Sequence, residues 1–218
     1  MKWFLASLAT GCASAGPGNN IIGGVPDAPT DAQVTLIQTA SLEVTGINSF
    51  FCVTGAPNTT RSNSYYRVFG LEDAGVTTTL HVSAVMFGIQ DAMAGRGGMQ
   101  RAKLNLGTYD TPPSGDTLDT SLIRSLGSAD IQIPDGNNTR MTVPIAADVA
   151  PSTNLIVELA IPADNSVKNL FHIGSNAQGE RKPGYWQAPN CGLTDPTTTQ
   201  SLSAGNEADI VMTVIGMQ

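Results

Sequence analysis

Residues 169–192, NLFHIGSNAQGERKPGYWQAPNCG, form the stretch around which we expect the rest of the chain to fold. The first five residues make a strand-like run, and Gly174 ends it. A polar loop follows, and the aromatic pair Tyr185 and Trp186 then leads to Cys191. We predict that this stretch fastens the two ends of one β-sandwich to each other.

Residues 76–90 give the longest strand pattern outside that stretch. The apolar face would carry Leu80, Val82, Ala84 and Met86. The polar face would carry Thr77, Thr79, His81 and Ser83. A period of two predicts a strand with one buried face.

Shorter runs of the same kind occur at residues 33–39, 41–45, 64–71, 101–108, 139–145, 154–161 and 209–215. Residues 121–133 fit either a helix or a strand, and a strand is favoured at their end. The turn residues Asp-Gly-Asn-Asn at 135–138 are typical of a β-hairpin. The sequence shows no convincing amphipathic helix, so we predict an all-β fold, an antiparallel β-sandwich of the jelly-roll-like kind.

The composition favours short strands joined by tight turns, with 23 Gly, 13 Pro and only 13% charged residues. The net charge is −7, and basic residues gather only at 180–182, Glu-Arg-Lys. Binding of a phosphate backbone needs grouped cations. We therefore predict no nucleic-acid partner.

The N-terminus predicts export. Lys2, a short apolar run and the small residues at 13–15 indicate a secretion leader over residues 1–15. Two alternatives stay open: Gly11 and Cys12 resemble the end of a bacterial lipobox, which would make a lipoprotein through Cys12, or an apolar N-terminal element is retained.

The rest of the chain divides simply. Residues 16–32 are rich in Gly and Pro and predict a linker, which leaves residues 33–218 as one sandwich domain. No other apolar run approaches the ~20 residues that a membrane span needs. We expect a secreted, extracellular protein without a membrane span.

Cys52 and Cys191 are the cysteines that remain once the leader is removed. An even pair in an exported protein predicts a disulfide. Two buried free thiols are the alternative. A metal site is less favoured, because the chain has no CxxC or Cys/His spacing.

Four motifs resemble a recurrent β-sandwich module of secreted bacterial proteins: SYYRVFGL at 64–71, FHIGSNAQG at 171–179, GYWQAPNCG at 184–192 and IVMTV at 210–214. That module occurs alone or appended to exported hydrolases and adhesin-like chains, and the resemblance covers about residues 34–216. It implies a jelly-roll-like fold and, through the match at both cysteines, a disulfide. It implies no activity. Residues 205–209 depart from the pattern, because they lack its aromatic and His residues.

The polar loop and its aromatic pair form the candidate binding edge, where amide and hydroxyl groups beside a flat ring would suit a neutral sugar. The candidate residues are His172, Ser175, Asn176, Gln178, Tyr185, Trp186 and Gln187. The alternative is that these polar side chains only satisfy the loop's own backbone. Core packing is favoured for Tyr185, while Trp186 fits either a core position or an exposed platform.

The sequence offers little for catalysis. GxSxG, HExxH and GxxxxGK[ST] are all absent, so we predict that the protein is not an enzyme. His81 is expected to be exposed on its strand, and a structural role is favoured for His172. Glycoside hydrolysis needs two carboxylates across a cleft, for which Glu158 with Glu72 or Asp73 could be proposed, but acidic residues at strand ends are usually solvated.

A structural calcium ion is the one cofactor hypothesis, because loop carboxylates often hold calcium in exported β-sandwiches. Asp110, Asp116 and Asp119 gather in one Pro- and Gly-rich loop. No EF-hand spacing occurs, and a solvated acidic loop is the alternative.

Three functions follow from these patterns. The first is a secreted, non-catalytic module with a structural or adhesive role at the exterior of a bacterial cell. The second is a carbohydrate-binding module that uses Trp186 and the loop of residues 175–187. The third is a self-assembling surface or filament subunit, in which the Gly- and Pro-rich N-terminal segment and residues 33–39 complement a neighbour's sheet edge. The expected partner is a glycan or another cell-surface molecule.

Overall fold

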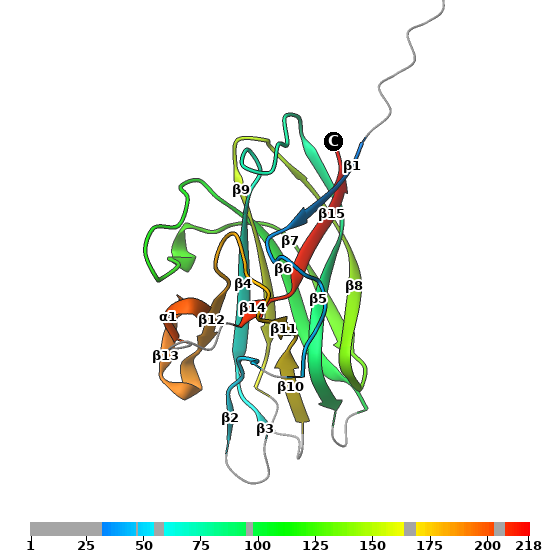
Figure 1. The fold of residues 1–218 in the computed structure, drawn as a ribbon, viewed down its shortest axis with the longest axis vertical. Coiled ribbons are helices and arrows are strands. Elements are labelled where there is room, and N and C mark those ends of the chain that lie inside the picture. Colours follow the sequence, from blue (N-terminus) through cyan, green and yellow to red (C-terminus); the bar gives the residue numbers. More distant parts are fainter. Residues whose placement is uncertain (1–31, 47, 55–58, 95–97, 164–168, 203–207) are drawn as a thin grey trace, which may run out of the picture. The chain divides into compact units, whose positions relative to one another are not determined.

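The computed structural model describes residues 32–46, 48–54, 59–94, 98–163, 169–202 and 208–218 (Figure 1). They belong to one compact unit, Asp31–Gln218. The predicted leader, Cys12 and nearly all of the predicted linker lie outside the described residues. The described part of the proposed self-assembling segment, residues 33–39, contains Gln33–Ile37, which pairs with residues 213–217 of the same chain.

Two antiparallel sheets make up most of the fold, which confirms the predicted all-β sandwich. The five-stranded sheet has the order β1 (Gln33–Ile37), β15 (Met212–Met217), β5 (Leu80–Ala94) and β10 (Asn169–Ile173), with β8 (Gly136–Val149) also paired to β5. The six-stranded sheet has the order β13 (Leu193–Thr198), β12 (Tyr185–Ala188), β4 (Asn63–Gly70), β9 (Asn154–Ile161), β6 (Gln100–Tyr109) and β7 (Arg124–Ile133).

Small elements complete the described part of the chain. Two short strand pairs are β2 (Val53–Thr54) with β3 (Thr59–Thr60) and β11 (Ser175–Asn176) with β14 (Asp209–Ile210). Its helical turns are η2 (Thr120–Leu122), η3 (Pro189–Cys191) and α1 (Thr199–Leu202). No helix among the described residues has the length and hydropathy to cross a membrane.

Several strand predictions need correction at their ends. The strand expected at residues 76–90 begins at Leu80, because a turn that contains Gly75 at φ +75° precedes it, and it continues to Ala94. Residues 41–45 form no strand, and only Thr45 makes an isolated bridge. The ambiguous segment 121–133 becomes the turn η2 followed by the strand β7.

The hairpin predicted at residues 135–138 is wrong. β7 ends at Ile133 and β8 already begins at Gly136, yet β7 pairs with β6 and β8 pairs with β5, so the chain passes from one sheet to the other here. The Asp135 carboxylate accepts a hydrogen bond from the backbone N–H of Ala94 at 2.8 Å. The side chain thus holds the end of β5, where the sequence pattern had suggested a tight turn between paired strands.

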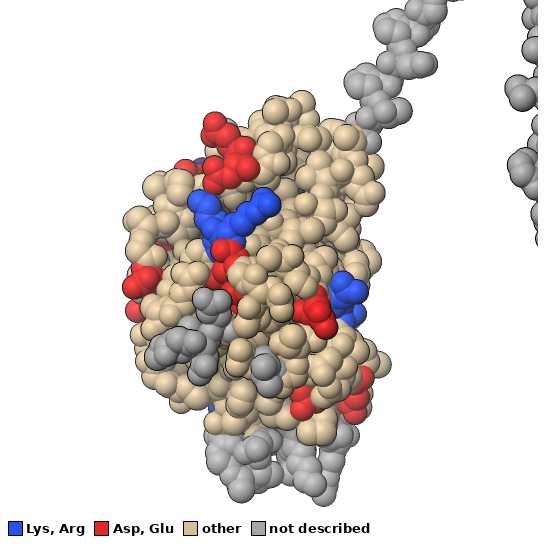
Figure 2. All heavy atoms as spheres, in the orientation of Figure 1, with Lys and Arg blue, Asp and Glu red and all other residues tan. Residues whose placement is uncertain are grey.

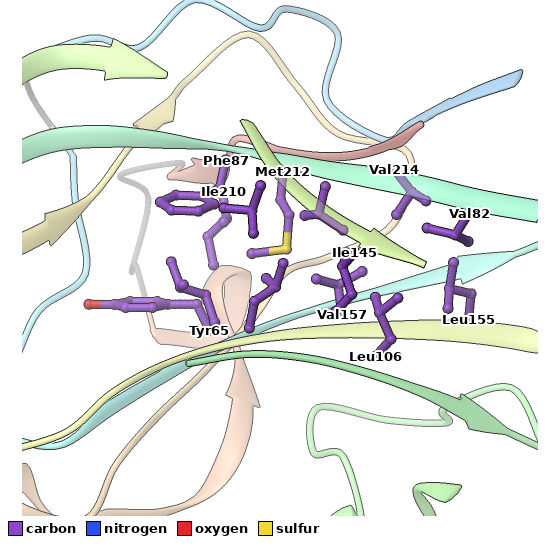
Figure 3. Close-up of a cluster of buried hydrophobic side chains, with 14 of the residues drawn as sticks. Tyr65, Val82, Phe87, Leu106, Ile145, Leu155, Val157, Ile210, Met212 and Val214 are labelled. Atoms are coloured by element: carbon purple, nitrogen blue, oxygen red, sulfur yellow. The ribbon is translucent and has the colours of Figure 1, made fainter. Parts of the chain in front are cut away.

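The main core lies between the two sheets, and Figure 3 shows part of it. Tyr65, Leu106 and Val157 enter this core from the six-stranded sheet, while Phe87 and Met212 enter it from the five-stranded sheet. A second, smaller hydrophobic cluster contains Tyr66, Val68, Tyr109, Leu118, Ile156 and Tyr185. Because neighbours along a strand face opposite ways, this second cluster covers the outer face of the six-stranded sheet.

Gly174 allows three strands to meet at one point. β15 and β10 follow one another along the same edge of β5, and Gly88 lies between their pairing regions. Here the N–H of Gly88 donates to Val211, that of Val211 donates to Gly174, and that of Gly174 donates to Gly88, each at 2.9 Å. A Cβ atom on Gly174 would overlap the backbone of Gly88. The junction therefore requires glycine at position 174.

Arg67 joins the two halves of the sandwich from inside. It lies on the same face of β4 as the core residues Tyr65 and Phe69, so its guanidinium enters the space between the sheets. Its Nη2 lies 2.6 Å from Oε2 of Glu180, and the two side chains are 0% and 1% exposed.

The remaining donors of Arg67 bind backbone carbonyls. Nε and Nη2 donate to Ile210 at 3.1 and 2.6 Å, and Nη1 donates to Lys182 at 2.6 Å. The side chain thereby connects β4 with β14 and with the loop that precedes β12. Asp209, also buried, accepts the N–H of Gly179 at 2.7 Å from the same loop.

We predict that Arg67→Met lowers the free energy of unfolding by about 3–5 kcal/mol, because it leaves the carboxylate of Glu180 buried without its cation. Urea denaturation measures the change. Arg124→Met is the matched control, since its ion pair with Asp110 joins side chains that are 74% and 57% exposed and should be worth under about 1 kcal/mol. Equal losses in the two variants would contradict a structural role for the buried pair.

Candidate functional site

The predicted disulfide is present and fastens one end of the candidate edge. Cys52 and Cys191 are bonded, with their Cα atoms 5.9 Å apart. Asn63 lies beside this bond, and its Oδ1 accepts the backbone N–H of Cys52 at 2.8 Å. The same oxygen accepts the indole N–H of Trp186 at 3.0 Å. The disulfide, β4 and β12 therefore meet at one buried amide.

Trp186 is neither an exposed platform nor a fully buried core residue. It is half-buried and packs against the main core. Its ring lies 5.4 Å from that of Phe50 at an angle of 42°. Because its N–H already donates to Asn63, its polar edge is committed to the fold.

Tyr185 and Gln187 lie on the opposite face of β12 from Trp186. Tyr185 is buried in the outer cluster, as favoured from the sequence, and burial raises the pKa of its phenol. The amide of Gln187 accepts a hydrogen bond from the hydroxyl of Tyr66 at 3.0 Å and donates to the carbonyl of Thr194 at 2.7 Å. Both side chains therefore help to hold β12 between β4 and β13.

Ser175 and Asn176 are buried and serve the backbone of the neighbouring segment. The Asn176 amide donates to the carbonyls of Ser41 and Glu43 at 2.9 and 3.0 Å, and its oxygen accepts the N–H of Gln178 at 3.1 Å. The Ser175 hydroxyl donates to the carbonyl of Asn48. These contacts fix residues 41–46 and Asn48, which form no strand of their own. Gln178 itself is exposed.

His172 is half-buried on β10, where its ring stacks on Phe51 with centroids 3.8 Å apart. Burial lowers the pKa of His172, and the charge of Asp91, its partner in register on β5, acts in the opposite direction. Nε2 is buried without a hydrogen-bond partner. His81 is exposed, as expected, with Nδ1 2.7 Å from the Asp148 carboxylate.

The candidate residues do not converge on one surface. His172 belongs to the five-stranded sheet, and Tyr185 and Trp186 point to opposite faces of the six-stranded sheet. Ser175 and Asn176 are enclosed. The geometry favours the alternative in which most polar side chains of the loop satisfy the protein's own backbone.

The three carboxylates of the calcium hypothesis have separate partners. Asp110 pairs with Arg124 at 2.6 Å, and Asp119 caps η2 by accepting from the N–H and hydroxyl of Ser121. The Asp116 carboxylate lies 3.4 Å from the hydroxyl of Thr198. No group of three His, Cys, Asp or Glu residues within the described ranges could hold a metal ion. Calcium binding stays a prediction, without a preformed set of ligands.

A pocket that the sequence did not reveal lies on the outer face of the six-stranded sheet. Its volume is 260 Å³, and Tyr66, Asn105 and Glu158 contribute polar groups to its lining. Thr120 and Ile123, from and after the turn η2, line another part of it. Sequence reasoning considered Glu158 only as half of a catalytic pair, because strand register was needed to bring its neighbours together.

Charged side chains are sparse on the face of the molecule shown in Figure 2. One small group of basic side chains is visible there, bordered by acidic side chains, and the other charged groups lie scattered among uncharged residues. On this face the basic side chains form no extended patch of the kind that binds a phosphate backbone.

Comparison with known proteins finds a similar fold. No protein-family model matches the chain, and no curated protein matches it by sequence. The fold resembles a crystal structure of the cysteine protease and lectin-like domains of Cwp84, a surface-layer-associated protein of Clostridium difficile, with a TM-score of 0.53 and 13% identity. The match covers 85% of this chain and 36% of that one, so the likeness concerns the fold of part of a longer protein.

We predict that Trp186→Ala lowers the free energy of unfolding by roughly 3 kcal/mol, because the indole packs on Phe50 and the core. Trp186→Phe keeps a ring but loses the bond to Asn63, and should cost about 1 kcal/mol. Chemical denaturation of both variants tests this. A loss below about 0.5 kcal/mol for the alanine variant would contradict this packing and restore the exposed platform.

We also expect stability to depend on pH through His172. Its pKa is lowered in the folded state, so the unfolded chain binds more protons below the usual value of 6.5. This contribution is present above about pH 6.5 and is lost as the pH falls through the folded-state pKa. His172→Phe keeps the stacking and removes the titration. The stability difference between wild type and variant, measured by urea unfolding, should therefore shift in favour of the variant at low pH. A difference that is constant with pH would contradict it.

Proposed function

We propose that this protein is a non-catalytic module that works outside a bacterial cell in a structural or adhesive role. The Cys52–Cys191 disulfide carries the proposal. Disulfides persist in oxidising environments and are rare in the reducing cytosol. The fold likeness to a structure that includes a lectin-like domain of a surface-layer-associated protein supports the same location and role.

The side-chain chemistry of the candidate edge supports a non-catalytic role. A serine nucleophile needs a base within hydrogen-bond reach. The hydroxyl of Ser175 instead donates to a backbone carbonyl. The ring of His172 stacks on Phe51 and so acts as a packing group. These groups stabilise the edge of the sandwich.

Glycan binding is the second candidate function, and the word lectin-like in the description of the Cwp84 structure favours it. The surface that would carry it differs from the one expected from the sequence, because Trp186 and Ser175 are committed to the fold. The outer pocket beside Glu158 offers acceptor groups in its place.

Adhesion of the full chain to isolated cell envelopes tests the proposed function. Beads coated with the oxidised protein should stay on envelope preparations under flow, and beads coated with reduced, denatured protein should wash off. Sugars and peptides released into the buffer are measured in parallel, and we expect none. Absence of retention on every envelope preparation would reject the adhesive role, and steady release of fragments would reject the non-catalytic one.

A further inference from the structure

A row of side chains crosses the outer face of the six-stranded sheet. Strand register places Tyr185 on β12 opposite Tyr66 on β4, Tyr66 opposite Glu158 on β9, and Glu158 opposite Asn105 on β6. Asn105 in turn lies opposite Ser128 on β7. Directly opposed residues share a face of the sheet. Residues far apart in sequence therefore form one continuous row.

The central part of this row lines the pocket of 260 Å³. Ile156 adds apolar surface to the lining, and Thr120, Ile123 and Ser125 close another side. That volume lies just below the ~300–1,000 Å³ of typical small-molecule sites. The pocket therefore suits one small ring better than an extended ligand.

Glu158 is held in place and keeps capacity to accept further hydrogen bonds. The Asn105 amide donates to its Oε2 at 2.8 Å. Tyr66 lies on its other side, and burial together with the charge of Glu158 raises the pKa of that phenol. A carboxylate has about four lone-pair sites. Asn105 occupies one of these sites, and the hydroxyl of Tyr66 donates to Gln187, so further sites stay open for a ligand that presents hydroxyl groups.

The charge of the pocket selects against anions. Among the described residues that line it, Glu158 alone is charged. An acidic ligand would meet a like charge without a compensating cation, in a chain whose net charge is −7. A ligand with hydroxyl donors and no negative charge fits this chemistry.

An exposed leucine lies in the turn that lines the pocket. Leu122 is 52% exposed and belongs to η2, between the lining residues Thr120 and Ile123. Carbohydrates combine hydroxyl groups with apolar C–H faces, so a site for one sugar ring needs acceptors and apolar contacts together. This pocket and its rim supply both.

We propose that the pocket binds one residue of a neutral saccharide, with Glu158 accepting hydrogen bonds from its hydroxyl groups and with Ile123 and Ile156 contacting its C–H face. The inference rests on the proposed function as an adhesive module and names the site and ligand class that such adhesion would use.

The test is an NMR titration of the isotope-labelled full chain. The probes are methyl glucoside, methyl galactoside and the methyl glycoside of N-acetylglucosamine, with glucuronate and lysine amide as charged comparisons. At least one neutral glycoside should shift the signals of Tyr66, Asn105 and Ser125, and glucuronate should bind at least about tenfold more weakly, the effect expected for one charge-assisted contact.

Three variants make the test specific to the pocket. Glu158→Gln keeps the shape and removes the charge, and it should weaken binding of the neutral glycoside about tenfold or more. Thr120→Trp leaves Glu158 intact but should fill the pocket and abolish the shifts. Glu72→Gln, an exposed carboxylate in the turn after β4, is the matched control and should bind like the wild type. Thermal unfolding confirms that each variant is folded.

The outcomes separate this inference from the proposed function. If wild-type beads stay on envelopes and the Glu158→Gln and Thr120→Trp beads stay equally well, the pocket is not the site, although adhesion stands. If wild-type beads are not retained at all, the proposed function itself fails. Binding of lysine amide alone, equal binding of glucuronate, or no shift with any neutral glycoside would each overturn the inference.

Discussion

A guanidinium group buried between two sheets is the interaction on which this sandwich depends. Arg67 carries its charge to a position with no solvent exposure, where burial of an unpaired charge would cost several kcal/mol. Glu180 and the carbonyls of Ile210 and Lys182 compensate that cost only when β14 and the loop before β12 are in place. The Arg67–Glu180 ion pair therefore couples β4 to β14 and to the loop before β12. It favours one folded arrangement of that loop.

The strands and the disulfide could be predicted because their signals are local or depend on simple counting. Alternation of apolar residues around Leu80 marks β5, and Cys52 and Cys191 were the cysteines left after the predicted leader. β13 escaped prediction because its sequence, LTDPTT, has few apolar residues and contains Pro196. Proline is tolerated there because β13 is an edge strand, paired in the sheet to β12 alone.

The candidate site could be predicted only in part, because residue type does not show which partner a side chain will find. Asn176 has the amide that a sugar site needs, but Ser41 and Glu43, more than 130 residues earlier, use it for their carbonyls. Glu158 looked like a solvated acid, and only the register of β4, β9 and β6 places it between Tyr66 and Asn105. Long-range pairing decides both cases, and a single sequence contains no direct signal for it.

The polar side chains Arg67 and Asn63 on the inner face of the six-stranded sheet and Glu158 on its outer face differ in their hydrogen-bond partners, and that difference bears on function. On the inner side, Arg67 and Asn63 use their hydrogen-bonding groups on the protein itself, which stabilises the fold and leaves nothing for a ligand. On the outer side, Glu158 is oriented by a neighbour and still faces an open pocket. A fixed acceptor on a rigid sheet loses little conformational entropy when a ligand binds. The rigidity imposed by the buried charge and the disulfide is therefore what would let a small outer pocket bind at all.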